Sequence, residues 1–92
     1  MPYTGTYRTK SGRSYFRFSY EDQYDGEVRI YILSQPSYRG RPSDCHSTHR
    51  YGVSSRPYIC YEPAPTNQSD AIKISKAWAE NTEKYIEYGR SF

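Results

Sequence analysis

The chain has 92 residues, a formal net charge of +3 and an aromatic content dominated by twelve tyrosines. This length corresponds to one domain with one modest hydrophobic core. No window is long and apolar enough to cross a membrane, and the N-terminal residues lack the basic start and apolar run of a secretory signal. We therefore expect a cytoplasmic protein with reduced cysteines and no bound cofactor.

Arginine outnumbers lysine by nine to four, and most of the arginines and tyrosines precede residue 61. Arg presents a planar fork of donors that pairs with phosphate or carboxylate and stacks on rings. Tyr offers a rigid contact area with a polar tip. Residues 1–60 carry a net charge of +4 from nine basic and five acidic side chains, whereas residues 61–92 carry −1 from four and five. This asymmetry indicates a phosphate-bearing or acidic partner on the basic side, or simply a slightly basic surface.

Residues 1–33 are expected to form a three-stranded β-meander. Tyr3 to Arg8 is rich in Tyr and Thr, which is typical of an edge strand. After turn residues 10–13, Ser14 to Tyr20 alternates between two faces, and Val28 to Leu33 does the same. The Asp25–Gly26 pair between these two strands predicts a tight hairpin.

The alternation separates the side chains of the two central strands into two sets. The apolar set should face the core and consists of Phe16, Phe18, Tyr20, Val28, Ile30 and Ile32. The other set brings arginine and tyrosine within reach of each other on one face, and consists of Tyr15, Arg17, Arg29 and Tyr31. We interpret this face as a candidate binding surface. The alternative is cross-strand stacking that only stabilises a solvated face.

Residues 34–57 form a long loop rich in Arg, Tyr, Pro and Gly, with room for a short strand within residues 49–53. Loops of this length in compact domains are usually functional or disordered. We predict that the loop contributes to binding, and the alternative is a flexible connector. Its candidate contact residues are Tyr38, Arg39, Arg41, Arg50, Tyr51 and Arg56.

A final short strand is expected at residues 58–61 and a helix over residues 69–88. Ser69 suits the N-cap, Asp70 suits the positive end of the helix dipole, and Gly89 suits the C-terminal end. The apolar stripe of this helix consists of Ala71, Ile74, Trp78, Thr82, Tyr85 and Ile86, flanked by Ile72 and Ala79. The opposite, solvated side is expected to carry Lys73, Lys76, Glu80, Glu83, Lys84 and Glu87. The fold class is therefore α+β, with a small antiparallel sheet of three to four strands packed against one C-terminal helix, and Trp78 as the central contact.

One cluster resembles a metal or catalytic site, namely Cys45, His46, His49 and Cys60. Zinc ligands must converge tetrahedrally, and short zinc motifs space them by two to four residues. Because Cys45 and His46 are adjacent, we predict no metal and interpret the cluster as two buried thiols and two loop histidines. An acid–base pair of histidines for RNA cleavage, as in small ribonuclease toxins, is the enzymatic alternative. We expect a non-enzymatic protein, since any loop with two histidines would qualify.

In overall character the chain resembles the small phage-encoded inhibitors of bacterial defence, above all anti-CRISPR proteins. The features behind this resemblance are a short chain, no catalytic motif, a small sheet with one helix, and an Arg/Tyr surface that includes Tyr15, Arg17, Arg29, Tyr31, Arg39, Arg41, Arg50 and Tyr51. The group has no shared motif, so the resemblance assigns no residue a role. It implies docking on a CRISPR ribonucleoprotein, which blocks target DNA from pairing with the guide. The alternative is a free-standing RNA or single-stranded DNA binder, in which bases stack on exposed rings and arginines contact phosphates.

Overall fold

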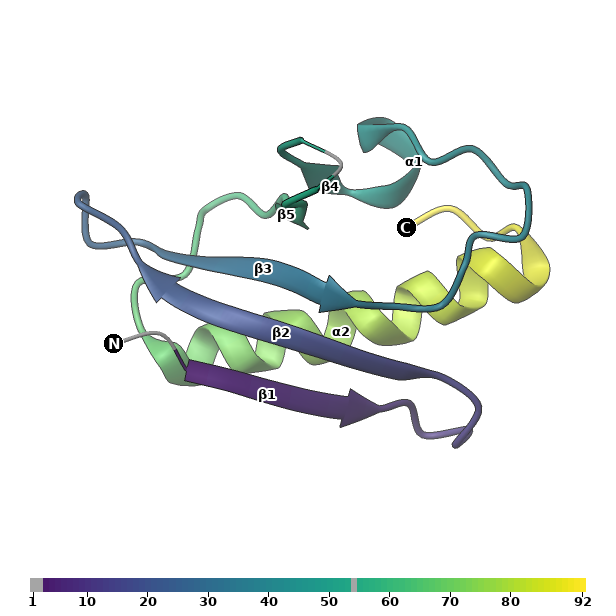
Figure 1. Ribbon diagram of the computed structural model, residues 1–92, viewed down its shortest axis with the longest axis horizontal. Helices are drawn as coiled ribbons and strands as arrows, with labels where there is room; N and C mark the ends of the chain where they lie inside the picture. The colour runs from purple at the N-terminus through teal and green to yellow at the C-terminus, as the bar shows by residue number, and fades with distance from the viewer. Residues whose placement is uncertain (1–2, 54) are drawn as a thin grey trace.

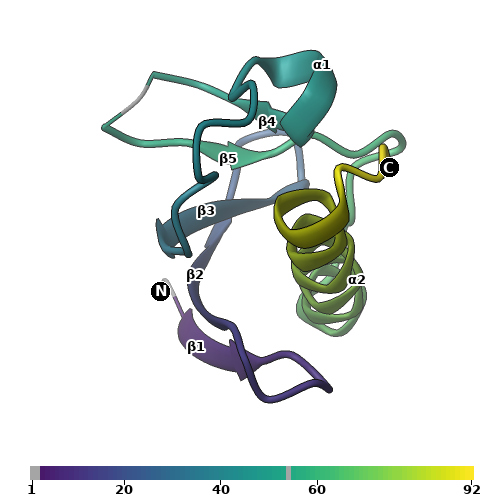
Figure 2. The ribbon, with the colours of Figure 1, turned by 90° about the vertical axis from the view of Figure 1, so that its right-hand side faces the viewer.

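A five-stranded antiparallel sheet with the order β1-β2-β3-β5-β4 is covered on one face by a C-terminal helix (Figures 1 and 2). The computed structural model describes residues 3–53 and 55–92, so Met1 and Pro2 of the expected meander and Ser54 of the expected loop lie outside the described residues. The predicted α+β class is confirmed, and the sheet has one strand more than the upper expected number.

The first three strands form the expected meander: β1 (Tyr3–Arg8), β2 (Tyr15–Asp22) and β3 (Val28–Ser34). β1 and β2 pair without a break in register, whereas the pairing of β2 with β3 shifts between Arg17 and Phe18. The predicted hairpin turn places Gly26 at a φ of 85°, a conformation that glycine adopts without a steric penalty. All three strands lie within two residues of their predicted bounds.

Residues 35–57 cross from the end of β3 to the far edge of the sheet and contain two short elements. The first is α1 (Cys45–Thr48), which no apolar periodicity predicts; the Asp44 side chain caps it by accepting from the Ser47 N–H. The second is β4 (Arg50–Tyr51), which pairs with β5 (Tyr58–Ile59). β5 also pairs with β3 and therefore lies between β3 and β4.

The long helix α2 spans Gln68–Tyr88. The prediction of Ser69 as its N-cap is wrong, because Asn67 precedes the first turn and its side chain accepts from the Asp70 N–H at 2.8 Å. The C-terminal prediction is confirmed: Gly89 ends the helix in the left-handed conformation, and its N–H donates to the Tyr85 carbonyl. In the part of the chain that the structure describes, no helix is both long and apolar enough to cross a membrane.

Trp78 is the central contact between α2 and the sheet, as predicted, and it is only 4% exposed. Its ring meets Phe16 and Phe18 edge-on, with centroid separations of 5.8 and 6.1 Å. The apolar side chains expected to face the core from β2 and β3 are all buried. The indole N–H also donates to the Thr48 carbonyl, so the same side chain fixes the end of α1.

The helix stripe differs from the predicted one in two ways. Ile74 is only half-buried, whereas Ser75 points inward and shares a 2.7 Å hydrogen bond with the Tyr20 hydroxyl. Burial raises the pKa of Tyr20, so this phenol stays protonated in the core. A core that relies on tyrosine needs such polar partners, because an unpaired buried hydroxyl is costly.

The expectation that Glu83 lies on the solvated side of α2 is wrong. The Glu83 carboxylate is buried and accepts hydrogen bonds from the hydroxyls of Thr9, Ser11 and Ser14 at 2.7, 2.9 and 2.6 Å. Burial alone raises the pKa of Glu83, but the hydrogen bonds from Ser14, Thr9 and Ser11 outweigh it, so the pKa lies below its usual value. The carboxylate therefore stays charged and ties the β1–β2 turn to the helix.

Two further carboxylates on the same helix face act on this turn. Glu80 accepts from the Tyr7 hydroxyl and from the Lys10 N–H, and Glu87 forms an ion pair with Arg13. The hydrogen bond to Glu80, followed by burial, raises the pKa of Tyr7 to about 12. We call this set of helix carboxylates, Glu80, Glu83 and Glu87, the hairpin clasp, because all three bind the β1–β2 hairpin.

Candidate functional site

The sheet face that points away from α2, called the open face from here on, carries the predicted Arg/Tyr side chains. Figure 2 shows α2 inside the curve of the sheet, while the opposite side of β1, β2 and β3 carries no helix in the described residues. Tyr15 and Arg17 are exposed on this face, and Arg29 and Tyr31 are half-buried. The structure thus brings all four predicted residues onto one face, with unequal exposure.

The portion of the open face on β1 and β2 is the more accessible one. The β1–β2 register sets Arg8 opposite Tyr15, and the Arg8 guanidinium carbon lies 4.6 Å from the centroid of the Tyr15 ring. Tyr15 remains 56% exposed. Arg17 lies opposite Thr6, and no carboxylate in residues 3–53 or 55–92 is within ion-pairing distance of it. This region therefore offers an exposed aromatic ring in contact with one cation, with a second cation on the same face of β2.

The portion of the open face on β3 and β5 forms a more enclosed cluster, which we call the Arg/Tyr stack: Arg29, Tyr31, Arg56 and Tyr58. The guanidinium carbon of Arg29 lies 4.2 Å from the Tyr58 ring centroid, and that of Arg56 lies 3.8 Å from the Tyr31 ring centroid. The two rings meet edge-on, with centroids 5.8 Å apart. Each cation thus covers a ring contributed by a different segment of the chain.

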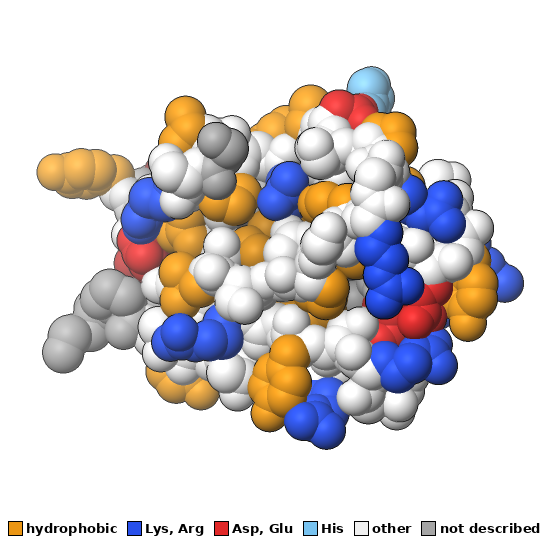
Figure 3. All heavy atoms as spheres, turned by 45° about the vertical axis from the view of Figure 1, so that its right-hand side comes forward, with side chains coloured by type: hydrophobic (Ala, Val, Ile, Leu, Met, Phe, Trp, Pro, Cys, Tyr) orange, Lys and Arg blue, Asp and Glu red, His pale blue; other side chains and the backbone are white. Residues whose placement is uncertain are grey.

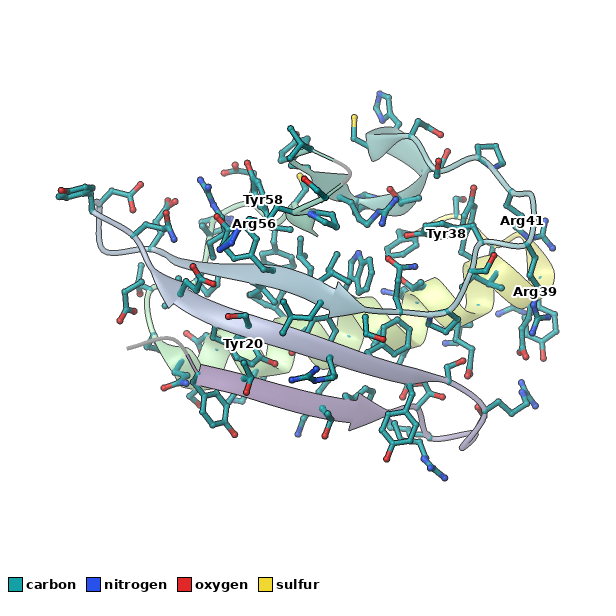
Figure 4. All side chains as sticks on the ribbon, viewed as in Figure 1. Tyr20, Tyr38, Arg39, Arg41, Arg56 and Tyr58 are labelled. Carbon is teal, nitrogen blue, oxygen red and sulfur yellow. The ribbon has the colours of Figure 1, made fainter. Side chains whose placement is uncertain are left out.

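A single acidic side chain completes the Arg/Tyr stack. Glu21 on β2 accepts two hydrogen bonds from Arg56 at 2.9 and 3.0 Å. Chiefly because of these bonds, the pKa of Glu21 lies below its usual value. The Arg56 side chain is still 51% exposed, so its remaining donors face solvent. In Figure 4, Arg56 and Tyr58 lie together near β3 and β5, on the half of the sheet away from Arg39 and Arg41.

Sequence reasoning misses two members of the open face, Arg8 and Tyr58. Their contacts depend on strand register: Arg8 lies opposite Tyr15, and Tyr58 lies opposite both Tyr31 and Tyr51. Only the alternation signal was available for Arg8, and the two-residue strand β5 is too short to define a face. Tyr51, a predicted contact residue, packs edge-on against Tyr58 with centroids 6.1 Å apart and is 47% exposed.

Two of the predicted loop residues, Tyr38 and Arg50, pack inward rather than onto the open face. Arg50 stacks on the Tyr38 ring at 4.9 Å and donates to the Gln35 side chain. The Tyr38 ring in turn meets Tyr85 of α2 edge-on, and burial raises the pKa of Tyr38. This arrangement attaches the loop to the helix, and it argues for a structural role for this part of the loop.

The remaining loop arginines lie at the C-terminal end of α2 (Figure 4). Arg41 donates from its Nε to the Ile86 carbonyl at 2.8 Å, and Pro42 accepts from the Tyr85 hydroxyl. A cation at this position satisfies a terminal carbonyl and suits the helix dipole. Arg39 is exposed and has a φ of 55°. The structure therefore does not bring Arg39 and Arg41 together with the sheet arginines.

The cysteines and histidines form no evident reactive centre. The expectation of two buried thiols is wrong, because Cys45 is exposed and Cys60 is only half-buried. The His49 ring stacks on Phe92 with centroids 4.7 Å apart. Among the residues that the structure describes, no group of three or more His, Cys, Asp or Glu side chains is arranged to hold a metal ion. The Tyr51 hydroxyl lies beside the Cys60 thiol, which raises the Tyr51 pKa.

The surface around the open face has a mixed character rather than a single charged block. Figure 3 shows Lys and Arg side chains spread among hydrophobic ones over this side of the molecule, with fewer acidic side chains between them. A hollow of about 220 Å³ adjoins the Arg/Tyr stack and is lined in part by Arg29, Tyr51, Tyr58 and Glu62. Such a surface suits a partner that offers both phosphate or carboxylate groups and flat or apolar groups.

Comparisons of the chain with protein-family models, with curated proteins and with solved structures found no match.

Proposed function

We propose that this protein acts by binding, and that it docks through its open face on a protein–nucleic-acid complex. The observation that carries the proposal is the exposed group on β1 and β2: Arg8 lies over the Tyr15 ring, Arg17 follows Tyr15 two residues along β2 on the same face, and Arg17 has no ion-pair partner in the described residues. The planar donors of the Arg17 guanidinium match the oxygens of a phosphate group. The exposed Tyr15 ring offers a surface on which a base or an apolar side chain can pack.

The Arg/Tyr stack supports the same proposal in a different way. Arg29 and Arg56 are held over rings, so their guanidinium planes lose little conformational entropy when a partner binds. Arg56 keeps exposed donors although it also binds Glu21. A pre-organised cluster beside a freer one is a suitable surface for a large partner, which needs both a rigid anchor and adaptable contacts.

The partner that we propose is a CRISPR ribonucleoprotein in the cytoplasm of a host cell, with target-DNA binding as the step that is blocked. Support comes from the resemblance of the whole chain to anti-CRISPR proteins and from the basic excess on the sheet and loop. In this proposal the open-face arginines contact guide-RNA phosphates or the protein surface that lines the nucleic-acid channel. Tyr15 and Tyr51 supply the flat contacts.

The test is an electrophoretic mobility-shift assay of target DNA with a panel of purified CRISPR ribonucleoproteins, with and without this protein. Inhibition by the wild type should be lost in Arg17→Glu. The matched control is Lys84→Glu, which makes the same charge change at an exposed position of α2. A second variant, Arg39→Glu, separates the sheet face from the loop. The proposal fails if no member of the panel is inhibited, or if Arg17→Glu and Lys84→Glu behave alike.

The two central arginines should differ in a way that reports on folding. Arg17→Glu should leave the thermal midpoint nearly unchanged, because Arg17 is exposed and unpaired. Arg29→Glu should lower the midpoint as well as weaken binding, because Arg29 covers Tyr58 and donates to Tyr31. Binding assays with Arg29→Glu therefore need the fraction of folded protein measured alongside.

A second candidate function is supported by the same exposed ring and the two cations on its face, which are the minimal arrangement for stacking a base and holding its phosphates. A free-standing RNA or single-stranded DNA binder should bind bare labelled oligonucleotides, with an affinity that falls steeply as salt increases. Fluorescence anisotropy at several salt concentrations distinguishes the two functions. An inhibitor of a ribonucleoprotein does not require affinity for the bare oligonucleotide.

A further inference from the structure

β1 is an unprotected edge strand of the sheet. Among the described residues it pairs with β2 alone, over six consecutive residues without a bulge, and Figure 1 shows no described element beyond its outer side. Natural edge strands usually carry charged side chains, a proline, a bulge or a cover, which prevent pairing with another chain. β1, Tyr-Thr-Gly-Thr-Tyr-Arg, has no proline and no bulge, and its one charge, Arg8, lies at the end next to the turn. Its outer N–H and C=O groups are therefore available for an additional strand.

The position of Gly5 gives this edge a specific shape. A hollow of about 200 Å³ opens between β1 and α2 at this residue, with Tyr3 and Tyr7 on either side and Ile72 and Lys76 on the helix side. Gly5 contributes no side chain that would fill it, and a Cβ built at Gly5 would meet no atom closer than 3.6 Å. A strand paired with β1 would direct the side chain opposite Gly5 toward this hollow, because opposed residues of paired strands point to the same face.

The other face of the same edge is cationic. The next residue of an added strand would lie opposite Thr6 and point to the open face. Thr6 is small and pairs with Arg17 on its inner side, and Arg8 lies two residues further along β1 on the same face. A side chain at this place would thus lie near two guanidinium groups, with only Thr6 between it and Arg17. Carboxylates are the side chains that such a position attracts.

We propose that β1 binds an extended peptide segment of a partner protein as an additional strand of the sheet. The segment has a large apolar residue opposite Gly5 and, next to it in sequence, an acidic residue opposite Thr6. Main-chain hydrogen bonds along β1 supply affinity, and the two adjacent side chains supply specificity. A second copy of this chain is a poorer occupant, because β1 contains no Asp or Glu and would bring Arg8 and Arg17 toward their own duplicates. This inference does not rest on the proposed function of the open face.

The test starts from a display library of short random peptides, selected on the full-length protein and counter-selected on Gly5→Val. Valine suits a strand, and its methyl groups would occupy the hollow without a clash at Cβ. We expect the enriched peptides to be extended, with an aromatic or branched aliphatic residue beside Asp or Glu. The affinity of the best synthetic peptide should fall about tenfold or more in Gly5→Val, because one buried apolar contact is lost.

Two further measurements separate strand addition from other modes. Two versions of the peptide are N-methylated, one at the odd-numbered and one at the even-numbered amides. Only every second amide faces β1, so one version should lose binding and the other should keep it. Arg17→Glu should weaken binding of the peptide. Arg56→Glu, which alters the Arg/Tyr stack alone, should leave the affinity for the peptide unchanged. Circular dichroism and a thermal midpoint confirm that Gly5→Val is folded.

Three results would overturn the inference. The first is the absence of any peptide that prefers the wild type over Gly5→Val. The second is a selected peptide that still binds after N-methylation of either set of alternate amides. The third is a dimer in analytical ultracentrifugation that Gly5→Val dissociates, because a second copy would then occupy the edge. Failure of the ribonucleoprotein assay, in contrast, leaves each of these outcomes unaffected.

Discussion

At the scale of single residues, the buried carboxylate of Glu83 is the most informative group. Its three hydroxyl donors, Thr9, Ser11 and Ser14, come from the turn between β1 and β2. Glu83→Ala leaves these donors without their acceptor and removes a charge-assisted network, so we expect a loss of about 3 kcal/mol in the free energy of unfolding. The loss is measured by urea denaturation, with the fluorescence of the single tryptophan as the signal of unfolding.

The matched control is Glu87→Ala on the same face of α2. Glu87 pairs with Arg13, whose side chain is 56% exposed, and such surface ion pairs contribute no more than about 1 kcal/mol. If both variants lost the same stability, the buried network around Glu83 would have no special weight, and the hairpin clasp would act only through surface charge.

Gly89 provides a second residue-scale prediction. It has a φ of 73°, and an added Cβ would lie 2.8 Å from a guanidinium nitrogen of Arg41. Gly89→Ala should therefore lower the free energy of unfolding by about 1 kcal/mol for the backbone conformation, and further for displacement of Arg41. Gly12→Ala is the control, because Gly12 has a φ of 80° and nothing within 4 Å of a built Cβ. An equal effect of both variants would show that the Arg41 contact does not matter.

The residue-scale successes and failures of sequence reasoning have one physical cause. Alternation along a strand is local, so it correctly directs Phe16 and Phe18 inward and Tyr15 and Arg17 outward. The position of Glu83 depends on hydroxyls that lie 69 to 74 residues away in sequence, and a helical wheel treats any Glu as solvated. Polar burial of this kind becomes visible only when the partner side chains are placed.

At the scale of elements, α1 and the loop around it depend on α2. The Trp78 indole donates to the Thr48 carbonyl at 3.0 Å, at the end of α1. Trp78→Phe keeps an aromatic ring in the core but removes this donor, so we expect a loss of about 1–2 kcal/mol from the unpaired carbonyl and the smaller ring.

The more specific readout of Trp78→Phe is local. The His49 amide, which donates to the Cys45 carbonyl, should exchange with solvent faster, while amides in β2 should change only as far as global stability falls. Hydrogen exchange monitored by NMR provides both values in one experiment. A uniform change across the chain would mean that Trp78 stabilises the core alone and does not hold α1.

The longer elements were predictable with their bounds, whereas of the short ones the two strands were anticipated and α1 was not. β1, β2, β3 and α2 each contain enough residues for their periodicity to emerge, and their bounds agree with prediction within two residues. α1 spans four residues, which is too short for a helical period to show, and β4 and β5 span two residues each, which is less than the expected ranges of 49–53 and 58–61. Their positions are set by the Asp44 cap, which is local, and by Trp78 and pairing with β3, which are tertiary effects.

The Arg/Tyr stack shows the same limit for the candidate site. The sequence predicts that Arg29 and Tyr31 share a face, and this is observed. It does not predict that Arg56 and Tyr58 return to cover them, because this contact exists only once β5 pairs with β3. The stack is therefore a product of the topology rather than of any motif.

At the scale of the whole molecule, stability should depend on pH in the acid range. The pKa values of Glu83 and Glu21 are both lower in the folded protein than their ordinary values. A carboxylate with a depressed pKa stabilises the fold above its unfolded pKa, and this stabilisation is lost as pH falls through the folded pKa, because the unfolded chain then binds more protons. We therefore expect the free energy of unfolding to fall progressively below about pH 4.5, near the ordinary pKa of glutamate.

The expected pH dependence is tested by urea denaturation of the wild type and of Glu83→Gln between about pH 3 and pH 7, in steps of about one pH unit. The wild type should lose stability toward acid pH more steeply than the variant, which lacks the titrating group. Parallel curves for the two proteins would place the acid sensitivity elsewhere, with Glu21 as the next group to substitute.

The hairpin clasp holds β1 at one end only. The turn at residues 9–14 is bound to Glu80, Glu83 and Glu87, whereas at the opposite end Tyr3 is held by stacking on Tyr20. We therefore expect local opening of β1 to begin at its Tyr3 end, because the turn end carries the additional contacts to α2. A ligand that pairs with β1 should therefore slow hydrogen exchange first at the amides near Tyr3.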